Sequence, residues 1–162
     1  MSEFTKIQCE ILKDVEKYHK GKDRFRWHCC DIGKRMFITE GHAAVIIPKE
    51  ELYLDVEKIP FGRTLIKGNV DQLLNDEGLA ELELRSTIEQ KMGTGLRKVC
   101  LLKSKDNTEK VYINKAYADW FKGQDVTFKG SYDGNRVLVY WYDVCIGVVM
   151  IIRGVGLEKL EE

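Results

Sequence analysis

The chain has 162 residues, enough to bury the core of one domain or of two small half-domains. Hydrophobic residues make up 44% and charged residues 32%, the balance of a folded protein rather than a disordered one. Because 26 basic and 26 acidic side chains cancel, the chain has no overall field that would attract nucleic acid or an anionic membrane.

The start of the chain, the length of its apolar stretches and its cysteines predict a cellular compartment. No basic segment followed by an apolar run opens the chain, so we expect no secretion signal. The longest apolar stretch, Val144 to Ile152, is far shorter than the roughly 20 residues of a membrane-spanning helix. Five cysteines with one adjacent pair do not match a disulfide framework. We therefore expect a cytoplasmic protein with reduced thiols and no membrane partner.

The first residues predict an amphipathic helix that ends at Gly21, where glycine favours helix termination. Apolar residues recur there at steps of three and four, the spacing of one helical face. These residues are Phe4, Ile7, Ile11, Val15 and Tyr18.

Three β-rich segments follow, and they predict an antiparallel meander. They are residues 25–30, 35–39 and 43–47, and the gaps between them are short and contain glycine, as in hairpin turns. Pro48 ends the last strand, and residues 48–52 predict a short helical turn.

The middle of the chain has the weakest pattern. Residues 61–67 predict a strand, residues 70–74 a helical turn and residues 79–84 a further strand. From residue 85 to 95 no periodicity is visible, and Gly93-Thr94-Gly95 predicts a flexible loop. We expect a single α+β domain over residues 1–162, in which a boundary between half-units would fall near residues 85–95.

The last third predicts a hairpin, a short helix and three strands. Residues 99–102 and 110–113 form the hairpin, and Asn114 is a suitable N-cap for a helix through Phe121. The strands are residues 126–129, 137–142 and 145–152. Residues 137–142 are apolar on both faces of the strand, which favours a central strand with Val139 and Trp141 buried.

Four histidine and cysteine residues are candidate metal ligands. The candidates are His28, Cys29, Cys30 and His42. In a strand, however, His28 and Cys30 point to one face and Cys29 points to the other. No fourth ligand stands at the spacing of a zinc site. We expect no metal, no cofactor and ordinary strand packing.

No catalytic motif is present in the sequence. Acidic pairs such as Asp76-Glu77 are typical of a solvated surface, and no serine lies in a nucleophile elbow. Gly93-Thr94-Gly95 lacks the lysine and the strand–helix context of a phosphate loop. We expect a protein that is not an enzyme, with an enzyme whose site leaves no local motif as a further alternative.

Lysines on the first predicted helix are the strongest candidates for phosphate contacts. Lys6, Lys13, Lys17 and Lys20 recur at steps of seven, four and three, which places them near one face. Lys115 and Lys122 on the later helix are further candidates. The alternative for all of them is the ordinary solvated face of a surface helix. The aromatic residues 120–121 and 140–142 are expected in the core, because no basic residue interrupts residues 137–152.

A helix followed by a meander occurs near the start of the chain and again near its end. Residues 36–45 form a strand, an acidic-glycine turn and a returning strand, and residues 137–153 form a strand pair that ends in an apolar run and an arginine. In this order the chain resembles half-units of the DNA sliding clamp family, of the compact kind encoded by phages and mobile elements.

The resemblance implies antiparallel meanders packed against two helices, with a clamp-like internal pseudo-repeat related by an approximate two-fold. It implies a non-enzymatic binding protein that contacts duplex DNA non-specifically, or a DNA-handling protein. A clamp encircles DNA with several such domains and a basic inner wall, so this neutral chain would have to form a homo-oligomer. The alternative function is a protein–protein inhibitor or adaptor of phage or mobile-element origin.

Overall fold

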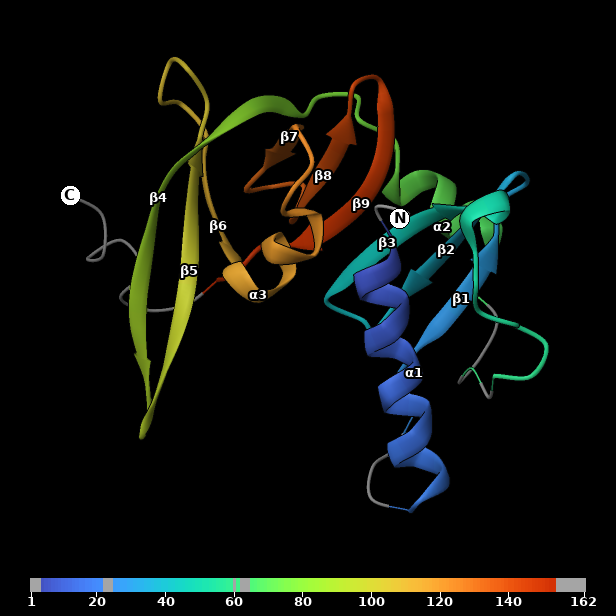
Figure 1. Ribbon diagram of the computed structural model, residues 1–162. Helices are drawn as coiled ribbons and strands as arrows, with labels where there is room; N and C mark the ends of the chain where they lie inside the picture. Colours follow the sequence, from blue (N-terminus) through green and yellow to red (C-terminus); the bar gives the residue numbers. More distant parts are fainter. Residues whose placement is uncertain (1–3, 22–24, 60, 62–64, 154–162) are drawn as a thin grey trace. The chain divides into compact units, whose positions relative to one another are not determined.

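The computed structural model describes residues 4–21, 25–59, 61 and 65–153 (Figure 1). The chain divides into two compact units, residues 1–75 and residues 76–162, which we call unit 1 and unit 2. The described residues contain three α-helices and nine strands, and all of the strand pairs within each unit are antiparallel. The predicted α+β class is therefore confirmed.

Unit 1 begins with helix α1. Of its predicted apolar stripe, Phe4, Ile7 and Ile11 are buried, Val15 is half-buried, and Tyr18 near the C-terminal end is exposed. The helix is capped by Lys20, and Gly21 follows with φ +72°, a backbone conformation that glycine adopts without strain. The elements of unit 1 are α1 (Thr5–His19), β1 (His28–Asp31), β2 (Arg35–Thr39), β3 (Ala43–Pro48), the 3-10 helix η1 (Lys49–Glu51) and α2 (Lys67–Leu73).

Strands β1, β2 and β3 form the predicted meander. Phe37 pairs with Cys30 on one side and with Ile46 on the other, so β2 is the middle strand of the three. The chain between η1 and α2 differs from the prediction. Residues 62–64 of the expected strand 61–67 lie outside the described residues, and Lys67 begins α2 instead of ending a strand.

Unit 2 contains six strands in the order β9-β8-β7-β4-β5-β6. Asn114 caps α3 as predicted, because its side chain accepts a hydrogen bond from the Ala116 N–H at 2.9 Å. The elements are β4 (Ala80–Met92), β5 (Gly95–Lys103), β6 (Lys110–Asn114), α3 (Lys115–Ala118), the 3-10 helix η2 (Asp119–Phe121), β7 (Val126–Ser131), β8 (Arg136–Trp141) and β9 (Val144–Met150).

The segment 85–95, which showed no periodicity, is regular structure. It completes β4, turns at Gly93 and begins β5, and the two strands pair from Glu83–Lys103 to Met92–Gly95. Periodicity was absent because most of these side chains are exposed on both faces of the ribbon, so no apolar face was needed.

Strand β8 lies between β7 and β9, and this explains its apolar faces. Val137, Leu138 and Val139 are all fully buried, which confirms the prediction for Val139. The prediction for Trp141 is wrong, since its side chain is 41% exposed. Trp141 is the last residue of β8, beside the turn into β9, where the sheet ends and less of the protein surrounds a side chain.

Candidate functional site

Helix α1 is anchored along one face, which decides which of its side chains are exposed. Ile7 and Ile11 are buried. Between them lies the buried Gln8, whose Nε2 donates to the Glu51 carbonyl at 3.0 Å and whose Oε1 accepts from the Tyr53 N–H at 2.6 Å. The apolar stripe and this buried amide leave the opposite side of α1 exposed.

The lysines predicted from the sequence lie on the exposed side of α1. Lys6, Lys13 and Lys17 are exposed within the helix, and Lys20 is its exposed C-cap. At 3.6 residues per turn the four positions fall within about 60° of one another, and they extend over about 21 Å. We call Lys6, Lys13, Lys17 and Lys20 the lysine face.

Most of the positive charge of the lysine face is not neutralised. Lys20 Nζ lies 2.6 Å from a Glu16 carboxylate oxygen, and this hydrogen bond and charge lower the pKa of Glu16. Lys6, Lys13 and Lys17 form no hydrogen bond or ion pair with any residue that the structure describes. A row of ammonium groups of this kind can meet anionic phosphates without distinguishing one base sequence from another.

The two lysines of the later helix differ in their surroundings. Lys115 Nζ lies 2.9 and 2.8 Å from the two carboxylate oxygens of Asp119, so its charge is already paired. Lys122 follows η2 and is exposed. Of the two ammonium groups, that of Lys122 is therefore the more accessible.

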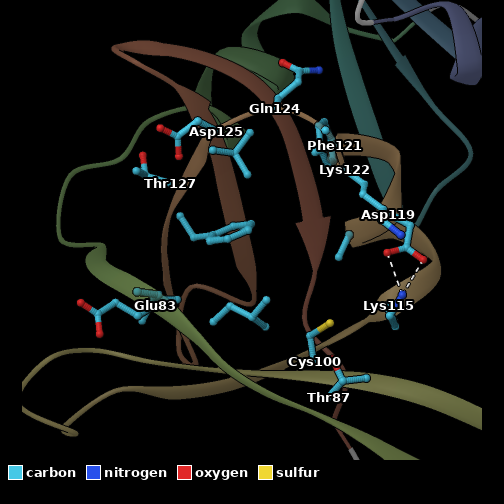
Figure 2. Close-up of a pocket in the computed structure, with 16 residues that line it drawn as sticks. Glu83, Thr87, Cys100, Lys115, Asp119, Phe121, Lys122, Gln124, Asp125 and Thr127 are labelled. Carbon is cyan, nitrogen blue, oxygen red and sulfur yellow. Dashed lines mark hydrogen bonds and ion pairs between the residues drawn. The ribbon is translucent and has the colours of Figure 1, made fainter.

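Unit 2 contains a pocket of about 700 Å³ between the α3–η2 segment and strands β4, β5 and β7 (Figure 2). Lys115 and Asp119 form their ion pair at one side of it, while Cys100 and Thr87 lie close together at another. The apolar walls come from Leu82, Leu84, Phe121, Val126 and Phe128.

Two titratable groups of this pocket, the Cys100 thiol and the Lys115 amine, are held in their protonated forms. Burial raises the pKa of the Cys100 thiol, which keeps it protonated and a poor nucleophile. The hydrogen bonds to Asp119 raise the pKa of Lys115, which keeps that amine charged and unable to accept a proton. The pocket is therefore suited to binding an apolar group.

The histidine and cysteine candidates for a metal site lie in a strand and a turn of unit 1. His28, Cys29 and Cys30 belong to β1, while His42 lies exposed in the turn before β3. Burial raises the pKa of both β1 thiols. Within the described part of the chain, no three histidine, cysteine, aspartate or glutamate side chains are grouped as ligands for a metal ion.

Two exposed features of unit 2 were missed by the sequence analysis. Trp141 and Tyr142 are 41% and 75% exposed, although core packing was predicted for both. Tyr142 has φ +54° in the short turn that joins the paired residues Trp141 and Val144, a left-handed conformation typical of tight hairpin turns. The other feature is the two-stranded ribbon formed by β4 and β5. The sequence contains one indication of this hairpin, the two glycines on either side of Thr94.

Comparisons with protein-family models, curated proteins and solved structures found no match for this chain. Among the residues that the structure describes, no helix has the length and apolar character needed to cross a membrane. A functional proposal for the chain therefore depends on its own residues.

Proposed function

We propose that this chain is a non-enzymatic cytoplasmic binding protein that contacts duplex DNA through the lysine face of α1. One observation carries the proposal: Lys6, Lys13 and Lys17 are exposed on one side of a helix and have no described carboxylate partner. Three neighbouring positive charges attract phosphates and release condensed counterions, which supplies most of the free energy of non-specific DNA binding.

The proposed architecture is a clamp-like pseudo-repeat of the kind found in phages and mobile elements. The order of elements supports it, because α1 is followed by β1, β2 and β3, and α3 with η2 by β7, β8 and β9. The two helices differ in length, with 15 residues in α1 and four in α3. A neutral chain of this size would encircle DNA only as a closed homo-oligomer.

The test is a salt titration of binding to a short fluorescent DNA duplex, followed by anisotropy. We expect weak binding that does not depend on base sequence, with a log–log salt slope of roughly −3 to −4 from the lysine face. The variant Lys6→Gln/Lys13→Gln/Lys17→Gln should bind at least about tenfold more weakly at low salt, and its slope should be smaller by about 3. Gln favours helix nearly as well as Lys, so α1 should persist.

The matched control neutralises three exposed lysines elsewhere, in the variant Lys34→Gln/Lys58→Gln/Lys105→Gln. It loses the same net charge and should bind as the wild-type chain does. Equal affinity of the lysine-face variant and this control would show that α1 does not contact DNA.

A second candidate function is a protein–protein adaptor or inhibitor, as the sequence also allowed. The apolar pocket of unit 2 and the exposed rings of Trp141 and Tyr142 favour it, since exposed aromatic groups are enriched where proteins bind one another. Failure of the wild-type chain to bind duplex DNA even at low salt would leave this candidate in place of the first.

A further inference from the structure

The strands β4 and β5 continue beyond the rest of their sheet as a two-stranded ribbon (Figure 1). Strand β4 pairs with β7 only from Ala80 to Leu82, and β5 pairs with β6 only from Val99 to Lys103. Among the described strands, residues 89–98 pair only with one another. We call residues 89–98 the ribbon arm.

The ribbon arm is not part of a hydrophobic core. Ile88 and Val99, directly before and after it, pack in a small cluster with Leu101 and Tyr112. Within the arm itself, every described side chain is exposed except those of Gln90 and Arg97, which are half-buried. A two-stranded ribbon is marginally stable by itself, so an exposed ribbon stabilises the fold little and is available to contact a partner.

The ribbon arm carries a local excess of positive charge. It contains Lys91, Arg97 and Lys98 against the single acid Glu89, in a chain that is neutral as a whole. Gln90 Oε1 accepts hydrogen bonds from Arg97 Nε, at 3.1 Å, and from Nη2. The Gln90 amide orients the Arg97 guanidinium but leaves its positive charge in place. A carboxylate at the same position would neutralise that charge. Lys91 and Lys98 form no ion pair with a residue that the structure describes.

We propose that the ribbon arm enters the major groove of duplex DNA, where Lys91, Arg97 and Lys98 meet the phosphates along the groove. The major groove of B-DNA is about 12 Å wide and 8.5 Å deep and accepts a two-stranded ribbon. Four residues of strand extend about 14 Å, enough to pass the phosphates and reach the base edges. The charge of the arm complements the groove.

This inference rests on the proposed duplex binding and adds a second contact, in unit 2, to the lysine face in unit 1. The two contacts predict different salt dependence and different selectivity between DNA and RNA duplexes. The lysine face accounts for a salt slope of roughly −3 to −4, and the three basic residues of the arm account for about −3 of their own. The deep, narrow major groove of A-form RNA does not admit a ribbon, so the arm should contribute to binding of duplex DNA and not of duplex RNA.

The experiment compares the wild-type chain with Lys91→Gln/Arg97→Gln/Lys98→Gln, using labelled DNA and RNA duplexes of equal length. The arm variant should bind DNA at least about tenfold more weakly at low salt, with a slope smaller by about 3, and should bind RNA as the wild type does. The control is Lys34→Gln/Lys58→Gln/Lys105→Gln. If the triple variant fails to fold, Lys91→Gln/Lys98→Gln keeps the Arg97–Gln90 contact and should reduce the slope by about 2.

The outcomes separate this inference from the proposed function. Wild-type affinity of the arm variant for DNA, together with weakened binding by the lysine-face variant, would overturn the arm and keep the lysine face. The reverse pattern would keep the arm and reject the lysine face. Equal weakening of DNA and RNA binding would overturn insertion into the major groove, because phosphate contact outside the groove does not distinguish the two duplexes. No DNA binding by the wild type would overturn both.

Discussion

Two tryptophans that the sequence predicts no differently have very different solvent exposure in the structure. Trp27 is 1% exposed, and its Nε1 donates to a carboxylate oxygen of Asp14 at 2.7 Å. Trp141 is 41% exposed at the end of β8. The first side chain therefore contributes to the core of unit 1, while the second contributes mainly surface.

We expect Trp27→Ala to lower the free energy of unfolding by about 3–5 kcal/mol, because it leaves a cavity and removes one of the two hydrogen-bond donors to the Asp14 carboxylate, the other being Arg26. Trp141→Ala serves as the matched variant and should lower it by less than about 1.5 kcal/mol. Urea unfolding followed by circular dichroism measures both. A larger loss for Trp141→Ala than for Trp27→Ala would contradict the burial described for these side chains.

A second residue-scale feature is the carboxylate of Asp76. It accepts hydrogen bonds from the Tyr140 hydroxyl at 2.9 Å and from Lys129 Nζ at 3.2 Å, and these lower the pKa of Asp76. Burial, followed by the hydrogen bond to Asp76, raises the pKa of Tyr140. A carboxylate whose pKa is lower in the folded chain stabilises the fold above its unfolded pKa and ceases to do so as pH falls through the folded value.

Tyr140→Phe should therefore be less stable than the wild type at neutral pH, by about 1 kcal/mol for the lost hydrogen bond. The difference should shrink as the pH falls below about 4, the pKa of an aspartate in the unfolded chain, and toward the lower pKa of Asp76 in the folded chain. Unfolding by urea at pH 7 and at pH 3 measures it, with Tyr53→Phe, an exposed tyrosine, as the control. A difference that stays constant with pH would show that the hydroxyl does not act through Asp76.

At the scale of elements, α1 is held by a polar anchor as well as by its apolar stripe. Gln8 Oε1 accepts from the N–H groups of Tyr53 and Leu54, at 2.6 and 3.3 Å, and Nε2 donates to the Glu51 carbonyl. The Glu51 carbonyl belongs to the last residue of η1, and the Tyr53 and Leu54 N–H groups belong to the segment after it. One side chain therefore ties this part of the chain to the helix.

Gln8→Leu has nearly the same volume but cannot replace these hydrogen bonds. It should lower the free energy of unfolding by about 1–3 kcal/mol, because buried backbone groups lose their partners. Leu12→Gln, at an exposed position of the same helix, should change it by less than about 0.5 kcal/mol. Thermal unfolding of both variants is the measurement. If Gln8→Leu unfolds at the same temperature as the wild type, water or another group must form hydrogen bonds with these backbone groups.

At the scale of the whole molecule, the distribution of charge matters more than its sum. Positive charge gathers on the lysine face and on the ribbon arm, although basic and acidic residues balance at 26 each. The proposed clamp-like arrangement further requires several copies of the chain around one duplex.

We expect size-exclusion chromatography with light scattering to give one closed homo-oligomer, an integer multiple of 18.8 kDa that stays constant over a range of protein concentrations. Measurement at high salt provides the control, because salt removes electrostatic self-association but not a ring held by apolar contacts. A monomer at every concentration would exclude the ring while leaving both DNA contacts open to their own tests.

The sequence by itself determined the elements whose signals are local. The helix over residues 5–19, the meander of β1 to β3 and the Asn114 cap depend on spacing, turn residues and capping within a few positions, and all were predicted close to their observed bounds. The four lysines were likewise identified from their spacing on α1, and their exposure follows from the opposite apolar stripe.

Only the tertiary structure decided burial and long-range pairing. Alternation along residues 137–142 shows that both faces of β8 are apolar, but whether Trp141 is covered depends on where the sheet ends. The ribbon arm has no sequence periodicity, because a strand held only by its partner's backbone hydrogen bonds needs no apolar face. For the same reason its three basic side chains could not be placed on one exposed ribbon until the pairing of β4 with β5 was known.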